Sequence, residues 1–275
     1  MGKHAKTLEL LDLARAILAD GHPMTVRQVY YQLVSRQVIE NKRTAYQKVS
    51  DLLVDARKSG AIPWGWVEDR LRRPRAVGMW RDLADFAETA RRAYRRDVWA
   101  AQSVYIEVWL EKDALSGIFE DVLRDYGVTL NVGRGYDGWD SIHNAAVRYA
   151  QRGCPVTVLY FGDFDPSGED MVRSLRDRLG ELGSDPEIIK CALTPDDVTR
   201  YNLPPDFAKR TDSRAAAFIE QHGDVSVELD ALPVGVLRAR IVDELESRLD
   251  LDALAQVQAQ ENAERRRLAA LLGAA

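Results

Sequence analysis

Apolar runs and amphipathic stretches alternate along residues 102–193. Four short runs are apolar almost throughout, as expected for strands buried on both faces of a parallel sheet, and they lie at 103–110, 128–132, 155–162 and 187–193. Longer stretches between them repeat their apolar positions at helical spacing, and they lie at 112–126, 139–151 and 167–181. This order predicts the α/β class, with a Rossmann-like, mostly parallel sheet covered by helices.

The N-terminal part of the chain has a different pattern, with three helical stretches and no long apolar run. Helices are expected at 3–20, 26–37 and 44–58, and Thr25 fits the N-cap position of the second. The aromatic segment IPWGWVED, residues 62–69, is punctuated by Gly and Pro and has the form of a β-turn or wing. Three short helices followed by such a ribbon is the order of winged-helix DNA-binding domains.

The chain is therefore expected to have three parts. These are a winged-helix domain at 1–75, a basic connector at 76–101, and an α/β domain with a helical extension at 102–275. Segment 225–233 could add a strand to the sheet. The extension is expected to hold two helices, at 234–249 and 251–272, of which the second could pack on the domain or mediate dimerisation.

Charge adds more to this picture than composition does. The chain has 275 residues and a net charge of −5, with the 46% hydrophobic and 29% charged content of an ordinary globular protein. Residues 1–100 contain 19 Lys and Arg against 12 Asp and Glu, whereas residues 101–275 contain 19 against 31. A basic first part could meet a phosphate backbone, and an acidic second part could hold cations or simply be well solvated.

Several other signals narrow the class of protein. No stretch of 18 apolar residues is present, so no membrane span is expected, and the N-terminus does not resemble a signal peptide. Cys154 and Cys191 lie in or beside strand-like runs and are expected to be reduced core residues of a cytoplasmic protein. The four His and two Cys have no zinc-binding spacing.

Carboxylates directly follow two of the predicted strands. Glu111 comes after the first strand, and Asp163 and Asp165 come after the third. Ligands gather at the carboxyl ends of strands in an open α/β sheet, and carboxylates that converge there repel one another unless a cation lies between them. Because Mg²⁺ is held by one or two carboxylates, water and substrate phosphate, the three acids together predict a Mg²⁺ site for phosphate chemistry.

Each acid also has a structural interpretation when taken alone. Asp165 precedes Pro166 and could be only a helix N-cap. Glu111 could simply form an ion pair with Lys112 or Arg134. It is the combination of the three at strand ends that favours a functional site.

Three further acids have open roles. Glu107 lies on the same strand face as Glu111 and ranks below it as a metal ligand. Glu228 and Asp230 share one face of segment 225–233, and they could extend the metal site or belong to a helix-capping turn.

A tyrosine on the second predicted helix is a candidate nucleophile. Tyr30 belongs to the apolar stripe of that helix and is expected in the core, whereas Tyr31 lies off the stripe and is expected to be exposed. Arg27 is four residues before Tyr31, so the two side chains are neighbours on the helix surface. A phenol is a weak nucleophile at its ordinary pKa of about 10, and a nearby Arg can stabilise the phenolate and hold a phosphate. Without further context, Tyr31 is better explained as a surface or packing aromatic.

The segment GRGYDGW, residues 133–139, lies between the two acidic motifs. Its glycines permit a tight backbone close to a phosphate, and Arg134 could contact that phosphate directly. A Gly-rich turn between a strand and a helix is common, so the segment alone is weak evidence for a phosphate contact. Its position between the two acidic motifs strengthens that evidence.

These strings resemble a known family. LEKDALSGIF (110–119), GRGYDGW and FGDFDPSGED (161–170) resemble the Toprim domain in the A subunit of type IIB DNA topoisomerases and in the related meiotic double-strand-break proteins. VRQVYY resembles the winged-helix motif Arg-x-x-x-Tyr of the same family. The resemblance covers roughly residues 22–195, and the chain is most similar to the small standalone A-subunit-like proteins. It contains no ATP-binding domain of the B-subunit kind and no Walker motif.

The resemblance implies a topoisomerase-like enzyme that cleaves double-stranded DNA with Mg²⁺. It makes Glu111, Asp163 and Asp165 the metal ligands, with Glu111 also catalytic. It matches Arg27 and Tyr31 to the family's Arg and to its DNA-cleaving Tyr, which forms a 5′-phosphotyrosyl bond. Since the tyrosine of one subunit works with the metal site of the other in this family, a homodimer is implied. A separate ATPase B-type subunit or another accessory protein is a further possible partner, in a cytoplasmic, nucleoid-associated, phage-encoded or plasmid-encoded setting.

Basic residues could line the path of the DNA. Those predicted to contact it are Lys112 and Arg134 near the metal site, and Arg70, Arg72, Arg73, Arg75, Arg91, Arg92, Arg95 and Arg96 in or beside the connector. About half of the connector arginines are expected to form an ordinary solvated helix face. Trp64 and Trp66 are expected to pack within the wing rather than contact DNA.

Two other functions stay open at this stage. A Toprim nuclease would hydrolyse DNA with metal-activated water and leave Tyr31 idle. A non-catalytic DNA-binding protein would use the winged helix alone. A primase is less well supported, because no zinc-binding module precedes the acidic motifs.

Overall fold

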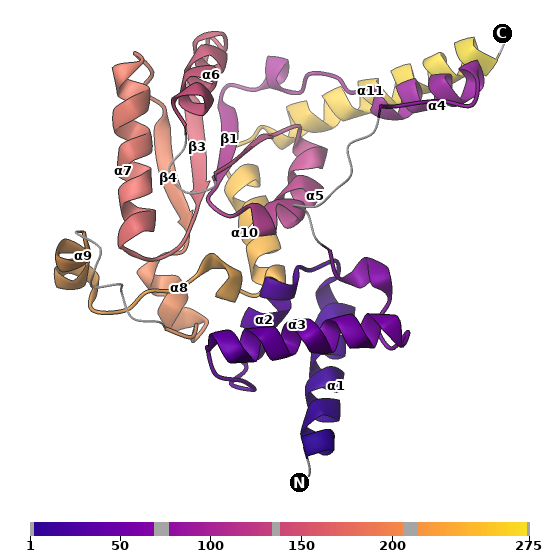
Figure 1. Ribbon diagram of the computed structural model, residues 1–275. Coiled ribbons are helices and arrows are strands. Elements are labelled where there is room, and N and C mark those ends of the chain that lie inside the picture. Colours follow the sequence, from indigo (N-terminus) through magenta and orange to yellow (C-terminus); the bar gives the residue numbers. More distant parts are fainter. Residues whose placement is uncertain (1–2, 69–76, 134–137, 206–213, 274–275) are drawn as a thin grey trace.

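A four-stranded, all-parallel sheet forms the centre of the computed structural model, which describes residues 3–68, 77–133, 138–205 and 214–273 (Figure 1). The strands are β1 (Tyr105–Leu110), β2 (Thr129–Val132), β3 (Val156–Phe161) and β4 (Glu187–Ala192), in the order β2-β1-β3-β4. In the register of the sheet, Trp109 lies between Asn131 of β2 and Tyr160 of β3. The predicted α/β class and the four predicted strands are confirmed.

Helices cover both faces of the sheet. The connecting helices are α5 (Ser116–Tyr126), α6 (Trp139–Ala150) and α7 (Pro166–Glu181), and α8 (Pro195–Arg200), α9 (Ala215–His222) and α10 (Val234–Glu246) follow β4. α6 packs beside α7 on one face, and α5 packs beside α10 on the other (Figure 1). The chain moves from β1 outward to β2 but from β3 outward to β4, in the opposite direction. The gap between the ends of β1 and β3 is therefore the switch point of the sheet, where such folds bind ligands.

Glu107 has a structural role in the middle of β1. Its side chain is fully buried and accepts hydrogen bonds from Tyr105 Oη at 2.9 Å, Asn131 Nδ2 at 2.7 Å and Tyr149 Oη at 3.1 Å. Arg148 adds a two-pronged ion pair at 2.7 and 2.9 Å. A buried carboxylate is tolerated only when it is paired and hydrogen-bonded in this way. All the bonds of the Glu107 carboxylate are thus made to neighbouring residues of the α/β part.

The N-terminal part is a bundle of three helices, α1 (Lys3–Gly21), α2 (Val26–Ser35) and α3 (Arg43–Lys58). The predicted cap of α2 is confirmed, because the Thr25 hydroxyl accepts from Gln28 N–H and the Gln28 side chain accepts from Thr25 N–H. These reciprocal bonds satisfy two donors at the start of the helix.

The expected β-ribbon after α3 is not formed by the described residues up to 68. The chain instead makes a 3-10 turn at Trp64–Trp66 and a single parallel bridge between Met24 and Val67. Trp64 is 62% exposed beside Arg57, so its predicted packing within a wing is wrong, whereas Trp66 stacks on His22 at 4.8 Å. The winged-helix and Toprim arrangement stays a prediction.

Two helices form an arm that projects from the body, α4 (Leu83–Ala93) and α11 (Leu251–Gly273) (Figure 1). Four connector arginines pair with acids of the arm itself: Arg91 and Arg92 with Glu88, Arg95 with Glu261, and Arg96 with Glu264. These pairs favour the solvated-face interpretation over a DNA path. The remaining predicted connector contacts, Arg70, Arg72, Arg73 and Arg75, lie outside the described residues.

Within the described ranges, no helix combines the length and the apolar character needed to cross a bilayer. Cys154 and Cys191 are both free, and Cys191 is buried. Cys191 is thus a core residue, as expected, whereas Cys154 is only partly buried at the edge of the core.

Candidate active site

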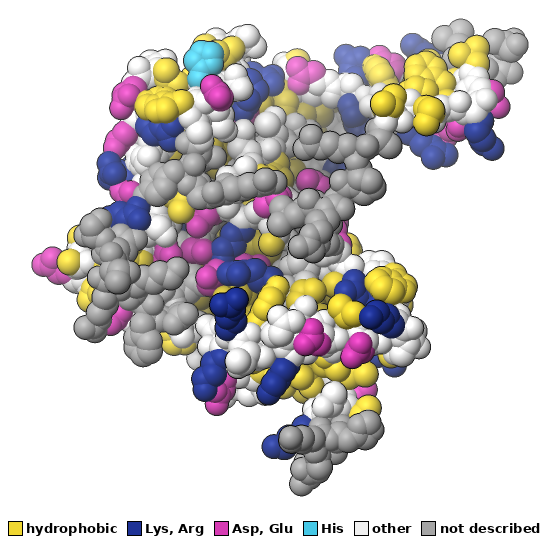
Figure 2. Space-filling model, viewed as in Figure 1, with side chains coloured by type: hydrophobic (Ala, Val, Ile, Leu, Met, Phe, Trp, Pro, Cys, Tyr) yellow, Lys and Arg dark blue, Asp and Glu magenta, His cyan; other side chains and the backbone are white. Residues whose placement is uncertain are grey.

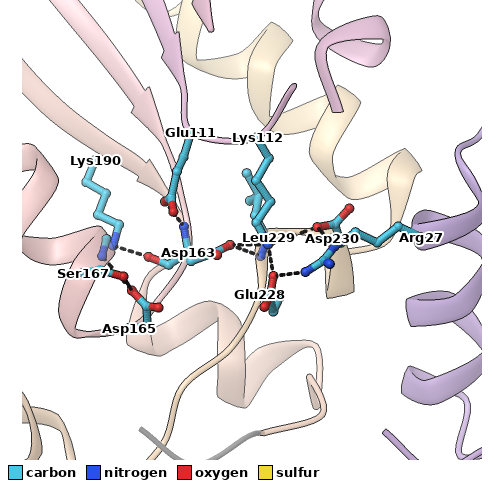
Figure 3. Close-up of polar contacts among 11 residues, drawn as sticks. Arg27, Glu111, Lys112, Asp163, Asp165, Ser167, Lys190, Glu228, Leu229 and Asp230 are labelled. Atoms are coloured by element: carbon cyan, nitrogen blue, oxygen red, sulfur yellow. Dashed lines mark hydrogen bonds and ion pairs between the residues drawn. The ribbon is translucent and has the colours of Figure 1, made fainter. Parts of the chain in front are cut away.

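The ends of β1 and β3 bring two of the predicted acids together. Glu111 follows β1 directly, and its Oε2 accepts a hydrogen bond of 2.8 Å from the backbone N–H of Asp163, just beyond β3 (Figure 3). Asp163 Oδ1 in turn accepts a bond of 2.7 Å from Leu229 N–H. Both carboxylates are thus fixed by backbone donors at the switch point of the sheet.

Two glycines of the FGDFDPSG motif allow this close approach. A Cβ on Gly162 would lie 2.5 Å from Glu111 Oε2 and 2.7 Å from the Tyr160 ring. A Cβ on Gly168 would lie 2.3 Å from the carbonyl oxygen of Asp163. Gly168 therefore requires glycine, because the clash is with backbone, whereas a side chain at Gly162 would force Glu111 and Tyr160 to move.

Asp165 has the structural role that its sequence context allowed. It is the N-cap of α7, with Oδ1 accepting from Gly168 N–H at 2.6 Å and from the Ser167 hydroxyl at 2.8 Å, and Pro166 begins the helix. Its charge still reaches the site, because it contributes to the raised pKa of Glu111. Asp165 therefore lies beside the pair of acids, tied to the helix by one oxygen.

Burial controls the protonation of the two acids. Burial raises the pKa of Asp163 to about 7, and Glu111 adds to the rise while Lys112 opposes it. Burial also raises the pKa of Glu111, against the hydrogen bond from Asp163 N–H. Because burial disfavours the ionised form of both carboxyl groups, a nearby cation would stabilise that form strongly.

Lys112 lies at the centre of an ion-pair cluster. Its Nζ is 2.9 Å from Asp163 Oδ1 and 3.0 Å from Asp230 Oδ2, and it also contacts Glu228. Burial favours the neutral amine, but the carboxylates of Asp230, Asp163 and Glu228 outweigh it and raise the pKa of Lys112. Lys112 was predicted to contact DNA, and the structure instead points its ammonium group inward among these acids, with the side chain 14% exposed.

The segment expected as an extra strand positions two of these acids. It forms a 3-10 turn at Leu229–Ala231 and one antiparallel bridge between Phe164 and Val227, so the strand prediction is wrong. Glu228, just before this turn, and Asp230, within it, both reach α2: Arg27 Nη2 lies 2.6 Å from Glu228 Oε2, and Arg27 Nε lies 3.2 Å from Asp230 Oδ2. A continuous line of charges therefore runs from α2 through the turn and Lys112 to Asp163 (Figure 3).

Tyr31 is buried, which corrects the expectation of an exposed ring. It is 8% exposed, because α2 packs on α1 and α3 and also on the 3-10 turn at Leu229–Ala231. The predicted neighbour is in place, with the Arg27 guanidinium 5.2 Å from the centre of the Tyr31 ring. Burial and the charge of Glu228 raise the pKa of the Tyr31 phenol to about 12, although Arg27 and Lys112 lower it. The phenol is protonated at neutral pH in this arrangement.

The donor set at the sheet edge fits Mg²⁺ in part. Among the described residues, no three His, Cys, Asp or Glu side chains are arranged to hold a metal ion. Mg²⁺ requires only one or two carboxylates and takes its other ligands from water and substrate phosphate. Glu111 and Asp163 each use one oxygen in the bonds above, and the other forms no hydrogen bond to the described part of the chain. These two acids are the ligands that the geometry favours.

The raised pKa of Asp163 predicts a pH-dependent effect of Mg²⁺ on stability. Because the pKa of Asp163 in the folded protein lies above its ordinary 3.8, the folded state holds the Asp163 proton more tightly than the unfolded state does. The protonated carboxyl therefore stabilises the fold at low pH, and this contribution is lost as pH rises towards about 7. Mg²⁺ binds the ionised form, so its effect should grow over the same window. We expect Mg²⁺ to raise the midpoint of thermal unfolding little near about pH 5.5 and clearly more near about pH 8. Calorimetry with Asp163→Asn as the control checks this, and an equal Mg²⁺ effect at every pH would contradict it.

The predicted site residues thus divide into three groups. Glu111 and Asp163 meet at the sheet edge with Asp165 beside them, and Arg27 and Tyr31 face them through the ion-pair cluster. Arg134 lies outside the described residues. Sequence patterns had left the roles of Glu228 and Asp230 open. Comparison with known proteins gave no match, either to a protein-family model or to a curated protein.

Proposed function

We propose that this protein cleaves DNA phosphodiester bonds with Mg²⁺ and that Tyr31 is the nucleophile. The observation that carries the proposal is the pair Glu111 and Asp163 at the switch point of the parallel sheet, each with one oxygen left without a hydrogen bond in the described chain. The line of ion pairs from Asp163 to Arg27 supports it, because it keeps α2, which carries Tyr31, beside that edge.

The residues have distinct roles in the proposed reaction. Mg²⁺ at Glu111 and Asp163 would stabilise negative charge on the phosphate and on the leaving oxygen. The Tyr31 oxygen bonds to phosphorus, the bond to the 3′-oxygen breaks, and the phenol proton ends on the released 3′-hydroxyl, so a 5′-phosphotyrosyl bond is formed. Arg27 first contacts the phosphate through Nη1, which its ion pairs with Glu228 and Asp230 do not use, and the phosphate then displaces those pairs.

The arrangement in a single chain must change before this reaction. Arg27 is bound to Glu228 and Asp230, and Glu228 raises the pKa of Tyr31. A DNA phosphate competes with these acids for Arg27, and its binding would separate α2 from the turn. The homodimer implied by the family resemblance offers one way to use the released tyrosine, at the metal site of a second subunit.

Glu111→Gln tests the metal part of the proposal. We expect wild-type protein to cut supercoiled plasmid in Mg²⁺ but not in EDTA, and Glu111→Gln to reduce the rate at least about a hundredfold, since a neutral amide holds Mg²⁺ poorly. Asp177→Asn is the matched control, because Asp177 is exposed on α7 and pairs only with Arg173 in the described chain. Cleavage by Glu111→Gln at the wild-type rate would refute the assigned role.

Metal-dependent hydrolysis of DNA by water is the second candidate. The burial of Tyr31 and its raised pKa favour this alternative, because a protonated phenol is a weak nucleophile. It uses the same acids at the sheet edge and leaves no protein attached to the DNA. The nature of the broken ends therefore separates the two candidates.

A further inference from the structure

A cavity of about 240 Å³ lies between the second and third helices of the N-terminal bundle. It is lined by two cations, three phenol rings and one amide: Arg27, Arg43, Tyr30, Tyr31, Tyr46 and Asn41. Pockets for drug-sized molecules begin at about 300 Å³, so this one suits a smaller group such as one nucleotide. Figure 2 shows Lys and Arg side chains over the region of α3 and along its border with the α/β part.

The cationic side of the cavity is available to an anion. Arg43 forms no ion pair with the described residues, and Arg27 uses Nε and Nη2 for its acids but not Nη1. α3 begins here, and its N-cap Lys42 makes no side-chain capping bond, so the first N–H groups of the helix have no cap. Two guanidinium groups beside an uncapped helix start favour a phosphate.

The aromatic side of the cavity offers a stacking surface. Tyr46 is 36% exposed and packs edge-to-face with Tyr30, at 5.3 Å between ring centres. Tyr30 is itself fixed, since its hydroxyl donates to Asn41 Oδ1 at 2.9 Å. A rigid, partly exposed ring beside a cationic groove is the combination on which single-stranded nucleic acids stack their bases.

Tyr31 connects the cavity to the proposed chemistry. Its ring lines the cavity, and its hydroxyl forms no hydrogen bond with any residue that the structure describes. The hydroxyl therefore has a donor and an acceptor position free for a ligand in the cavity. A phosphate held by Arg27 and Arg43 would lie beside this hydroxyl.

We propose that the cavity binds one unpaired nucleotide of a DNA strand, with its phosphate at Arg27 and Arg43 and its base against Tyr46. This inference rests on the proposed function and specifies its substrate. A paired base in duplex DNA lies inside the stack and cannot reach Tyr46, so the strand must be single or locally opened at this point. The preferred substrate is therefore DNA with an unpaired stretch rather than continuous duplex.

Binding of the full chain to labelled oligonucleotides in EDTA tests this proposal without any cleavage. We expect single-stranded DNA, and duplex DNA with an unpaired loop, to bind at least about tenfold more tightly than blunt duplex. Tyr46→Leu should lose about tenfold in affinity for the unpaired substrates, whereas Tyr46→Phe keeps the ring and should bind within about twofold of wild type. Arg43→Ala should weaken binding to all DNA, and Lys48→Ala, which removes an exposed cation of the same helix, should have a smaller effect.

Two results would overturn the proposal: equal affinity for duplex and unpaired DNA, or unchanged affinity of a folded Tyr46→Leu. Circular dichroism of each variant separates loss of binding from loss of fold. The binding result is also independent of catalysis. If the protein prefers unpaired strands but does not cleave DNA, the cavity assignment stands and the proposed cleavage activity is rejected. If it cleaves DNA without that preference, the proposed activity stands and the cavity assignment is rejected.

Discussion

Tyr31→Phe is expected to abolish the covalent protein–DNA adduct completely and to reduce strand cleavage by at least about a thousandfold, because the substitution removes the attacking oxygen. The ring and its contact with Arg27 are kept, so the fold and DNA binding should change little. The measurement is denaturation of a plasmid reaction, followed by detection of protein on the 5′ ends and of broken strands.

Tyr30→Phe provides the matched control for this experiment. Tyr30 is the adjacent phenol on the same helix, but its hydroxyl is bound to Asn41 and the backbone of Lys42. Its loss should cost about 1 kcal/mol of stability, and the adduct should still form, because the attacking oxygen of Tyr31 is kept. If Tyr31→Phe produced protein-free DNA ends at the wild-type rate, the tyrosine mechanism would be rejected and hydrolysis by water established.

Lys112→Met is expected to lower the free energy of unfolding by about 3–5 kcal/mol, the usual result of removing one partner from a buried ion pair. The aliphatic stem is kept, but Asp163, Glu228 and Asp230 lose the ammonium group that separates their charges. Urea denaturation followed by circular dichroism gives the value. The role of Lys112 as the organising cation would be disproved by a loss below about 1 kcal/mol.

Lys48→Met is the control for that substitution. Lys48 is an exposed residue in α3, and its replacement should change the free energy of unfolding by no more than about 0.5 kcal/mol. Added Mg²⁺ should restore part of the stability of Lys112→Met, because a cation can take the place of the ammonium group among the carboxylates.

The central sheet could be predicted because its signals are local. Each strand is a short apolar run, and parallel pairing brings the residues after β1 and β3 to one edge, so the meeting of Glu111 and Asp163 followed from the pattern. The capping bonds of Thr25 and Asp165 were equally local. Bonds within three or four residues along the chain leave a clear trace in sequence.

The environment of Tyr31 could not be predicted in the same way. The helical pattern of α2 accounts for one packing face, whereas α2 has a second partner about two hundred residues later, the turn at Leu229–Ala231. Gln28 and Gln32 are both buried, although their polarity suggests an outer face, and Gln32 donates a hydrogen bond to the carbonyl of Leu232 just after that turn. Hydrophobic periodicity does not record a partner that packs on polar side chains.

The expected ribbon after α3 fails for a related reason. Strand-like aromatic content in IPWGWVED suggests a hairpin, but Val67 pairs with Met24 and the two tryptophans lie in a tight turn. Short segments of this kind take the structure that their tertiary partners allow.

The shared use of Glu228 by Arg27 and Lys112 has a thermodynamic consequence. A ligand that draws Arg27 away from Glu228 changes the field around Lys112, and through it the proton affinity of Asp163. Binding of DNA at α2 and binding of Mg²⁺ at the sheet edge are then thermodynamically linked. DNA must change the affinity for Mg²⁺ by the same factor by which Mg²⁺ changes the affinity for DNA. Titration of DNA at several fixed Mg²⁺ concentrations, and of Mg²⁺ at several fixed DNA concentrations, would give that factor twice from independent data.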